Sequence, residues 1–320
     1  MKKQAKNKEI ISGISLTQEE RQELSKDFEQ ESFTFIAGPP VRYGNFFGRE
    51  EIIQNLFNLW KAFPMQNAAI YGEKRIGKTS LLLYLKDIID NPKNSRFRKE
   101  QQIEWLSKSE QYCFIYVNFQ DTDYHTPKGL LEYILQNMKL EKSEGLNLSL
   151  SEERPLSEFG RILSGHLIRP TIILMDEIGV VLERHSDKFG NDFWDGLRAI
   201  ATTKLEPQCL GFVLASHQHP KELVKRLSDK EIVPPSQFFN IFGYINELKE
   251  FTGVEARKLI ASSPKKISDD NIDFILKLSE LKPYLLQILC QMRLNQLRQN
   301  ENNDNWQQEA REHIEKRKIK

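Results

Sequence analysis

The residues with the clearest chemical meaning are Gly72 to Thr79, which read Gly-Glu-Lys-Arg-Ile-Gly-Lys-Thr and complete the pattern G-x-x-x-x-G-K-[ST]. The backbone N–H groups of such a loop can wrap a phosphate, and its glycines allow close approach. Lys78 would reach the outer phosphates of a nucleotide, and the Thr79 hydroxyl would bind Mg²⁺. The candidate ligand-binding residues of this phosphate loop are Gly72, Arg75, Ile76, Gly77, Lys78, Thr79 and Ser80.

The segments on either side of the loop fit the same interpretation. The apolar run 68–71 precedes the loop and predicts a buried strand, and residues 78–90 carry leucine and isoleucine at helical spacing. The N-terminus of that helix would point at the phosphates, where the helix dipole favours negative charge. A chance glycine-rich turn is the alternative, and the order of strand, loop and helix argues against it.

A second motif places two carboxylates after an apolar run. Residues 171–175 read Thr-Ile-Ile-Leu-Met and are followed by Asp176 and Glu177. Such runs are typical of parallel strands covered on both faces, and the carboxyl ends of these strands face the ligand in open α/β sheets. We expect Asp176 to hold Mg²⁺ together with Thr79, and Glu177 to orient and deprotonate an attacking water. A strand that simply ends in solvated acids is the alternative.

Two histidines, His217 and His219, follow the apolar strand predicted over 211–215. They could bind a metal, but zinc needs more ligands than the neighbouring sequence supplies. We therefore interpret this segment as a loop beside the nucleotide, in which His217 could help to sense the terminal phosphate.

The bulk composition excludes several classes of protein. The chain has 320 residues, of which 39% are hydrophobic and 28% charged, and its formal net charge is +1. These values fit a globular protein with one large or two ordinary domains, and the balanced charge does not support a nucleic-acid partner. No apolar stretch approaches the roughly 18 residues of a membrane helix, so we expect no membrane partner and no secretory signal. Buried thiols in the cytoplasm best explain the cysteines, which are Cys113, Cys209 and Cys290.

The pattern of elements divides the chain into four parts. Residues 1–35 form an appendage with a polar helix that begins at a capping pattern near Thr17. Residues 36–243 form an α/β domain in which five strands alternate with helices, which predicts a parallel sheet covered on both faces. Residues 244–300 hold three amphipathic helices that make a lid, and residues 301–320 make a polar, solvated tail.

Two details of the α/β domain are further expectations. The highly charged stretch 94–111 predicts an exposed excursion. The last strand is expected at 237–242, directly before the helical part of the chain.

Four motifs in this order resemble those of the STAND and archaeal-type AAA+-like ATPases. They are Ala37-Gly-Pro-Pro-Val with Phe46-Phe-Gly-Arg-Glu, the phosphate loop, Leu174-Met-Asp-Glu-Ile-Gly, and Pro283-Tyr-Leu-Leu-Gln. The resemblance implies a P-loop NTPase fold of the additional-strand (ASCE) type, with a parallel five-stranded sheet followed by a small helical lid. It also implies ATP or ADP with Mg²⁺ as ligands. The implied function is slow, regulated ATP hydrolysis that drives a switch or assembly module, of the kind found in bacterial signalling and antiphage defence.

The resemblance also assigns roles outside the phosphate loop. Phe47, Gly48 and Arg49 would lie near the base and the ribose, and Pro283 would lie near the adenine. Ser216 would take the sensor position at the end of the fourth core strand. The lid motif usually has glycines before its proline, whereas this chain has Glu-Leu-Lys at 280–282.

Two arginines are candidates for stabilising the charge of the transition state, in cis or across a subunit boundary. They are Arg198 and Arg226. Arg226 lies in a region similar to the one where oligomeric AAA+ proteins place an arginine finger. We therefore expect a homo-oligomer, or a protein effector or sensor, as the partner in addition to the nucleotide.

Two alternative functions stay open. One is a DNA-associated loader or motor subunit of the AAA+ type, against which the near-zero net charge argues. The other is a scaffold that holds ADP without hydrolysis, against which the complete set of Lys78, Thr79, Asp176 and Glu177 argues. A GTPase is disfavoured because no Asn/Thr-Lys-x-Asp segment for guanine is present.

Overall fold

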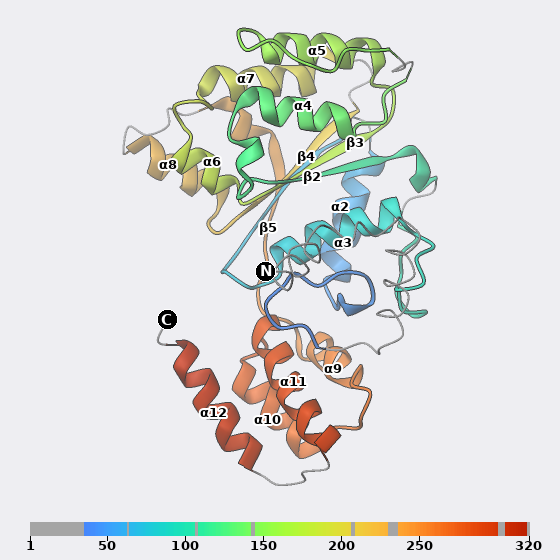
Figure 1. Ribbon diagram of the computed structural model, residues 1–320, viewed down its shortest axis with the longest axis vertical. Coiled ribbons are helices and arrows are strands. Elements are labelled where there is room, and N and C mark those ends of the chain that lie inside the picture. The colour runs from blue at the N-terminus through green and yellow to red at the C-terminus, as the bar shows by residue number, and fades with distance from the viewer. Residues whose placement is uncertain are drawn as a thin grey trace, which may run out of the picture.

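The structure is a computed structural model that describes residues 35–62, 64–105, 108–141, 145–205, 209–229, 236–299 and 305–318. It consists of an α/β body and a bundle of helices formed by the C-terminal part of the chain (Figure 1). The predicted appendage lies outside the described residues, apart from Phe35, which is buried in the core of the helical bundle. No helix in these ranges is long and apolar enough to cross a membrane.

One sheet of five parallel strands forms the centre of the body, in the order β2–β3–β4–β1–β5. The strands are β1 (Asn67–Tyr71), β2 (Cys113–Asn118), β3 (Thr171–Asp176), β4 (Leu210–Ser216) and β5 (Phe242–Glu247). Every residue of β3 and β4 is buried, because helices cover both faces of the sheet, and this explains why the two strands are apolar without alternation. The predicted parallel five-stranded sheet is confirmed.

Helices α2 and α3 cover one face of the sheet, and α4 to α8 cover the other (Figure 1). Alternate residues of β3 serve the two cores, with Ile172 and Leu174 on the first face and Ile173 and Met175 on the second. The helices are α2 (Glu50–Lys61), α3 (Lys78–Asp90), α4 (Pro127–Asn137), α5 (Pro155–His166), α6 (Ile178–Arg184), α7 (Asn191–Ala199) and α8 (Pro220–Asp229). Short helical turns are η1 (Tyr43–Asn45), η2 (Ser109–Gln111), η3 (Thr122–Tyr124), the π-turn η4 (Ile200–Lys204) and η5 (Gln237–Ile241).

The last strand begins where the sequence predicted its end. Residues 237–241 form the turn η5, and β5 runs from Phe242 to Glu247, so the α/β body extends past the predicted boundary at 243. Phe238 and Phe239 are buried against Trp194, with ring centroids 5.2 and 5.8 Å from it. The aromatic residues that indicated a strand therefore serve as core under α7.

Four helices make up the C-terminal bundle, which we call the lid. They are α9 (Gly253–Ala261), α10 (Asp269–Ser279), α11 (Pro283–Gln299) and α12 (Asn305–Lys318). A solvated, partly helical tail was expected over 301–320; its described part is the helix α12, which is not free in solvent but packs into the lid core through Trp306, Ala310 and Ile314. These side chains are four residues apart and form a single stripe, which the polar composition of the segment conceals.

Strand β2 lies at one edge of the sheet, where its outward carbonyl groups would be open to another strand. Three carbonyl groups along this edge instead accept hydrogen bonds from side chains. One donor lies on α3, one on α4 and one two residues after the end of α4. The pairs are Lys86 Nζ with Phe114 O (3.0 Å), Tyr133 Oη with Tyr116 O (3.1 Å) and Lys139 Nζ with Tyr112 O (3.5 Å). We call this the capped edge.

Candidate functional site

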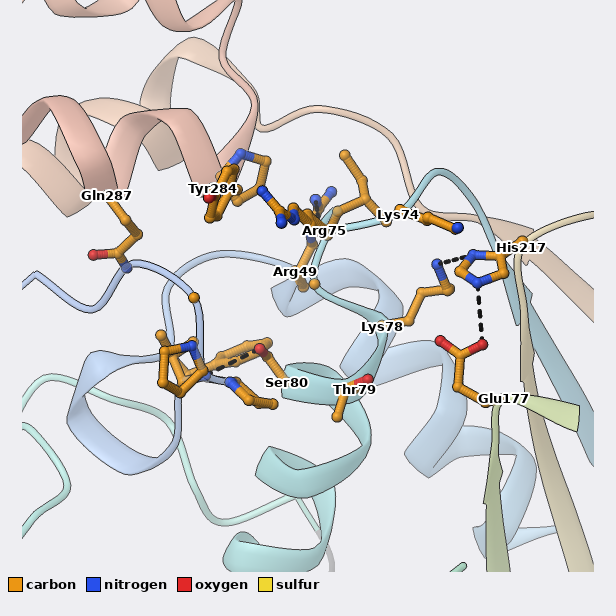
Figure 2. A pocket seen from close by; sticks show the side chains of 18 of the residues that line it. Arg49, Lys74, Arg75, Lys78, Thr79, Ser80, Glu177, His217, Tyr284 and Gln287 are labelled. Carbon is orange, nitrogen blue, oxygen red and sulfur yellow. Dashed lines mark hydrogen bonds and ion pairs between the residues drawn. The ribbon is translucent and has the colours of Figure 1, made fainter. Parts of the chain in front are cut away.

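The phosphate loop joins β1 to α3 at the carboxyl end of the sheet. It forms one wall of a cavity of about 900 Å³ between the body and the lid (Figure 2). Gly72 has a φ of +150°, and a Cβ atom there would lie 2.5 Å from the carbonyl oxygen of Leu248, just beyond β5. Only glycine fits this close approach of two backbones, so the first glycine of the motif is required by the packing of β1 on β5. Gly77 immediately precedes α3.

Lys78 is the next-to-last residue of the loop, and its side chain turns back to the backbone carbonyl groups at the start of the loop. Its side chain is only 5% exposed, and its Nζ donates to the carbonyl groups of Gly72 and Glu73, both at 2.8 Å. Burial lowers the pKa of Lys78, against the attraction of the carboxylates of Glu177 and Asp176. The loop carbonyls therefore hold the ammonium group at the place from which it could reach a bound phosphate. Thr79 also lines the cavity, in the first turn of α3.

Asp176 ends β3 and is 1% exposed, so it lies beneath the cavity wall and does not line it. Its Oδ1 accepts from the backbone N–H of Glu177 at 3.0 Å, and its Oδ2 accepts from Tyr116 Oη at 2.9 Å. Burial and the neighbouring Asp176 raise the pKa of Tyr116, which keeps the phenol protonated and able to donate. Sequence analysis missed Tyr116, because only the register of β2 against β3 brings it to the carboxylate.

A chain of polar contacts links Lys78 to Glu177 through His217 (Figure 2). His217 Nδ1 lies 3.4 Å from Lys78 Nζ, and His217 Nε2 lies 3.1 Å from Glu177 Oε2. Burial is the main cause that lowers the pKa of His217, so the ring is neutral at pH 7. A neutral ring with an ammonium on one side and a carboxylate on the other accepts at Nδ1 and carries its proton at Nε2.

The predicted sensor, Ser216, ends β4 but does not line the cavity. It is buried, and its hydroxyl donates to the carbonyl of Gln218. Successive side chains at a strand end point to opposite sides, so the next residue, His217, is the one that faces the phosphate loop. Within the described ranges no group of three or more potential metal ligands gathers, so nothing supports the metal-binding alternative for His217 and His219.

Phe47, Arg49 and Pro283 all line the cavity on the side away from His217. The guanidinium group of Arg49, however, points into the protein. It donates to the carbonyl of Lys249 at 2.5 Å, contacts those of Glu250 and Ile76 at 3.5 Å, and lies over the Phe251 ring. Arg49 was predicted to lie near the base and ribose, but its charged group is bound to the segment between β5 and α9.

Glu255 of α9 connects the lid to Arg49. Its Oε1 accepts from the backbone N–H of Arg49 at 2.6 Å, and its Oε2 accepts from the backbone N–H of Thr252 at 2.8 Å in a capping box. Gly48 packs directly against this carboxylate. We call Gly48, Arg49, Glu255 and residues 249–251 the hinge node.

The charged stretch after α3 was predicted to be an exposed excursion, and most of its described residues are exposed or half-buried, but some of its side chains bind the start of the body. Gln101 Nε2 donates to the carbonyl of Tyr43 at 3.0 Å, and Arg98 donates to that of Phe46 at 3.2 Å. The guanidinium group of Arg98 also lies 3.7 Å from the centre of the Phe47 ring. This stretch therefore fixes the wall of the cavity formed by Phe46 and Phe47. On the same side, Ser80 Oγ accepts from the backbone N–H of Val41 at 3.1 Å.

Only one of the two candidate arginines can be placed relative to the cavity. Arg198 lies on α7, which packs against α5 and does not line the cavity (Figure 1). Arg226 belongs to α8, but its side chain lies outside the described residues. Arg75 and Ile76 of the phosphate loop do line the cavity.

Neither a protein-family model nor a curated protein matches the sequence. Solved structures do match. The Walker-type ATPase of Pyrococcus abyssi has 16% identity and a TM-score of 0.55, over 89% of this chain and 77% of that chain. The Aeropyrum pernix ORC2 protein, solved as ADPNP–ADP complexes, has 12% identity and a TM-score of 0.59, over 86% of this chain and 70% of that chain.

The fold is therefore that of a P-loop NTPase of the ASCE type, in which one strand, β4, separates the phosphate-loop strand β1 from the acidic strand β3. The likeness to the archaeal Walker-type ATPase and ORC2 structures extends over most of the chain and confirms the predicted resemblance at the level of fold. At these identities the likeness establishes the fold and not the activity.

Proposed function

We propose that the protein binds ATP together with Mg²⁺ and hydrolyses it slowly, and that the bound nucleotide controls the position of the lid. The observation that carries this proposal is the continuous contact from Lys78 through His217 to Glu177, beside the buried Asp176. A cation for phosphate, a carboxylate for water and a buried carboxylate for metal are the three parts that phosphoryl transfer to water needs.

The residues present fit a magnesium ion. Mg²⁺ prefers oxygen ligands and keeps several of its waters, and Thr79 supplies a hydroxyl at the head of α3. Each oxygen of Asp176 accepts one hydrogen bond, which leaves acceptor capacity for a metal-bound water. Mg²⁺, when bound, would neutralise part of the phosphate charge.

The protein's own groups define the remaining roles. Lys78 would exchange its two loop carbonyls for phosphate oxygens, and Glu177 would orient a water and take its proton. The N–H of His217 donates to Oε2 of Glu177 and so occupies one of the two oxygens that could take a proton from water. This contact supports slow hydrolysis over rapid turnover.

The switch role rests on the connections between body and lid. The hinge node links α9 to the start of α2, and Pro283 brings α11 to the cavity. We therefore assign the protein to the STAND type of nucleotide-dependent switch or assembly module in the cytoplasm, with a second copy or a protein effector as its partner. Bacterial signalling or antiphage defence is the setting that this assignment suggests.

One alternative has a specific observation in its favour. The His217–Glu177 contact would also suit a scaffold that holds ADP and turns over nothing, because Glu177 is then never free to activate water. The alternative of a DNA-associated loader has no such support, since the net charge is only +1.

Single-turnover phosphate release with Mg-ATP tests the proposal. Glu177→Gln should bind ATP normally and hydrolyse it at least about a hundredfold more slowly. Lys78→Ala should lose about thirty- to a thousandfold in affinity, because a charge-assisted contact is removed. Glu183→Gln is the matched control, since this acid lines the same cavity and should leave the rate unchanged. If wild type binds ADP but releases no phosphate from ATP, the scaffold replaces the ATPase.

A further inference from the structure

The lid touches the tip of the phosphate loop directly. The guanidinium group of Arg75 lies over the ring of Tyr284, 4.3 Å from its centre, and Lys282 Nζ lies 3.8 Å from Glu73 Oε2 (Figure 2 shows Arg75 and Tyr284). Tyr284 is in the first turn of α11. Glu73 and Arg75 occupy positions that the phosphate-loop pattern leaves open. The variable residues of the loop therefore carry contacts to the lid.

Arg75 belongs to the phosphate loop through its backbone and contacts the lid through its side chain. Its backbone belongs to the phosphate loop, with a φ of 65° that is unfavourable for a residue with a side chain. Its side chain leaves the loop and reaches across the cavity to the lid. The backbone conformation of the loop and the position of α11 are thus joined through one residue.

Two of the connections between body and lid, the hinge node and the loop tip, differ in burial. At the hinge node Arg49 is 8% exposed and is bound to the body and to α9. At the loop tip the side chains of Lys282 and Glu73 are 36% and 73% exposed. A lid that swings about the buried node would part from the exposed loop tip first.

We propose that Tyr284 is a positioning residue that couples the phosphate loop to the lid. A nucleotide that fills the loop fixes the backbone of Arg75, which then presents its guanidinium group to Tyr284 and holds α11 over the cavity. This inference rests on the proposed nucleotide binding and adds the contact through which occupancy reaches the lid. A ligand shifts such an equilibrium only by contacts that differ between its states, and the Arg75–Tyr284 contact is of that kind.

The coupling between nucleotide binding and closure of the lid is reciprocal. If a nucleotide favours the closed lid by a given factor, the closed lid raises the affinity for the nucleotide by the same factor. An exposed cation–π contact corresponds to a factor of about two to five. Loss of the Tyr284 ring should therefore weaken ADP binding and lid protection by that factor together.

The test compares wild type with Tyr284→Leu, Arg75→Met and the double variant, and Tyr284→Phe is the control that keeps the aromatic ring. Calorimetry gives the ADP dissociation constant, and amide exchange with and without ADP reports on residues 72–79 and on α9 to α12. Tyr284→Leu should bind ADP about two- to fivefold more weakly and show a reduction of the ADP-dependent protection of the lid by the same factor. At saturating ADP it should keep the protection of the loop. Tyr284→Phe should match wild type, and the double variant should be no weaker than Arg75→Met alone.

Different outcomes refute different parts. Full lid protection by ADP in Tyr284→Leu would overturn the coupling role, and so would an equal loss in Tyr284→Phe, which would assign the effect to the hydroxyl group. Wild type that binds ADP without slower exchange in the lid would overturn this inference and leave the nucleotide site intact. Wild type that binds no ADP would overturn the proposed function and this inference with it.

Discussion

The contact between Gly48 and Glu255 gives a quantitative test of the hinge node. Gly48 has a φ of +70°, and a Cβ atom there would lie 2.4 Å from Glu255 Oε1. The carboxylate is not free to move away, because it accepts from the N–H of Arg49 at 2.6 Å and from the N–H and hydroxyl of Thr252 at 2.8 and 3.0 Å. Gly48→Ala must therefore strain the backbone and break these bonds.

The expected cost of Gly48→Ala follows from both effects. Alanine at a positive φ costs about 1–2 kcal/mol. Displacing the carboxylate removes its half of the capping box of α9, the bonds that it accepts from Thr252, worth about 1 kcal/mol. It also leaves the N–H of Arg49 unpaired, which costs about 1–3 kcal/mol more. We expect Gly48→Ala to lower the free energy of unfolding by about 3–6 kcal/mol and Glu255→Ala by about 2–4 kcal/mol.

The double variant separates the two effects. Once Glu255 is absent, Gly48→Ala should cost only the backbone strain of about 1–2 kcal/mol. Urea unfolding of wild type, both single variants and the double variant measures the coupling, and amide exchange in α9 reports the same change locally. Gly253→Ala is the matched control, since a Cβ atom there meets nothing within 4 Å. The reasoning would be refuted if the free-energy costs of the two single variants added up in full in the double variant. The new methyl group would then not meet the carboxylate.

Three further predictions concern the site and the lid. Tyr116→Phe removes the hydrogen bond to Asp176 Oδ2. We expect about fivefold weaker binding of Mg-ADP in calorimetry, with binding of metal-free ADP unchanged. Equal weakening of both would mean that Tyr116 does not act through the metal site. Trp306→Ala should destabilise the lid by about 3–5 kcal/mol, seen as faster amide exchange in α9 to α11 but not in the sheet, and faster exchange in the sheet would contradict separate cores. Burial alone would raise the pKa of Glu255, but hydrogen bonds from Arg49 and Thr252 lower it overall, so its contribution to stability is complete above pH 4.5 and lost as the pH falls below it. The stability difference between wild type and Glu255→Gln should therefore shrink as the pH falls below 4.5, and a constant difference would mean that the charge contributes nothing.

The parts of the site that sequence analysis predicted are those whose residues are neighbours in the chain. The phosphate loop, its strand and its helix form one continuous segment, so the pattern alone places Lys78 at the head of α3. The same holds for the carboxylates that end β3. Strands β1 to β4 were predicted for a related reason, since burial leaves a local apolar signal, whereas the half-exposed β5 was placed too early in the chain.

The parts that were missed depend on which segments meet in space. Tyr116 reaches Asp176 only because β2 pairs with β3 in one register, and Arg98 reaches Phe47 only because the segment after α3 returns to the start of the body. Arg49 was correctly placed at the cavity, but its partners are carbonyl groups two hundred residues away. Backbone acceptors have no sequence signal of their own, so a pattern search does not find them.

The capped edge of β2 constrains how copies of this chain could assemble. A second strand could add there only by displacing Lys86, Tyr133 and Lys139 from backbone carbonyls that they already satisfy. Continuous sheets across subunits are therefore disfavoured on that side, and so is the irreversible stacking to which open strand edges lead. On that side, contacts between copies of this protein would instead be made by helix surfaces, through side chains and not through shared backbone hydrogen bonds.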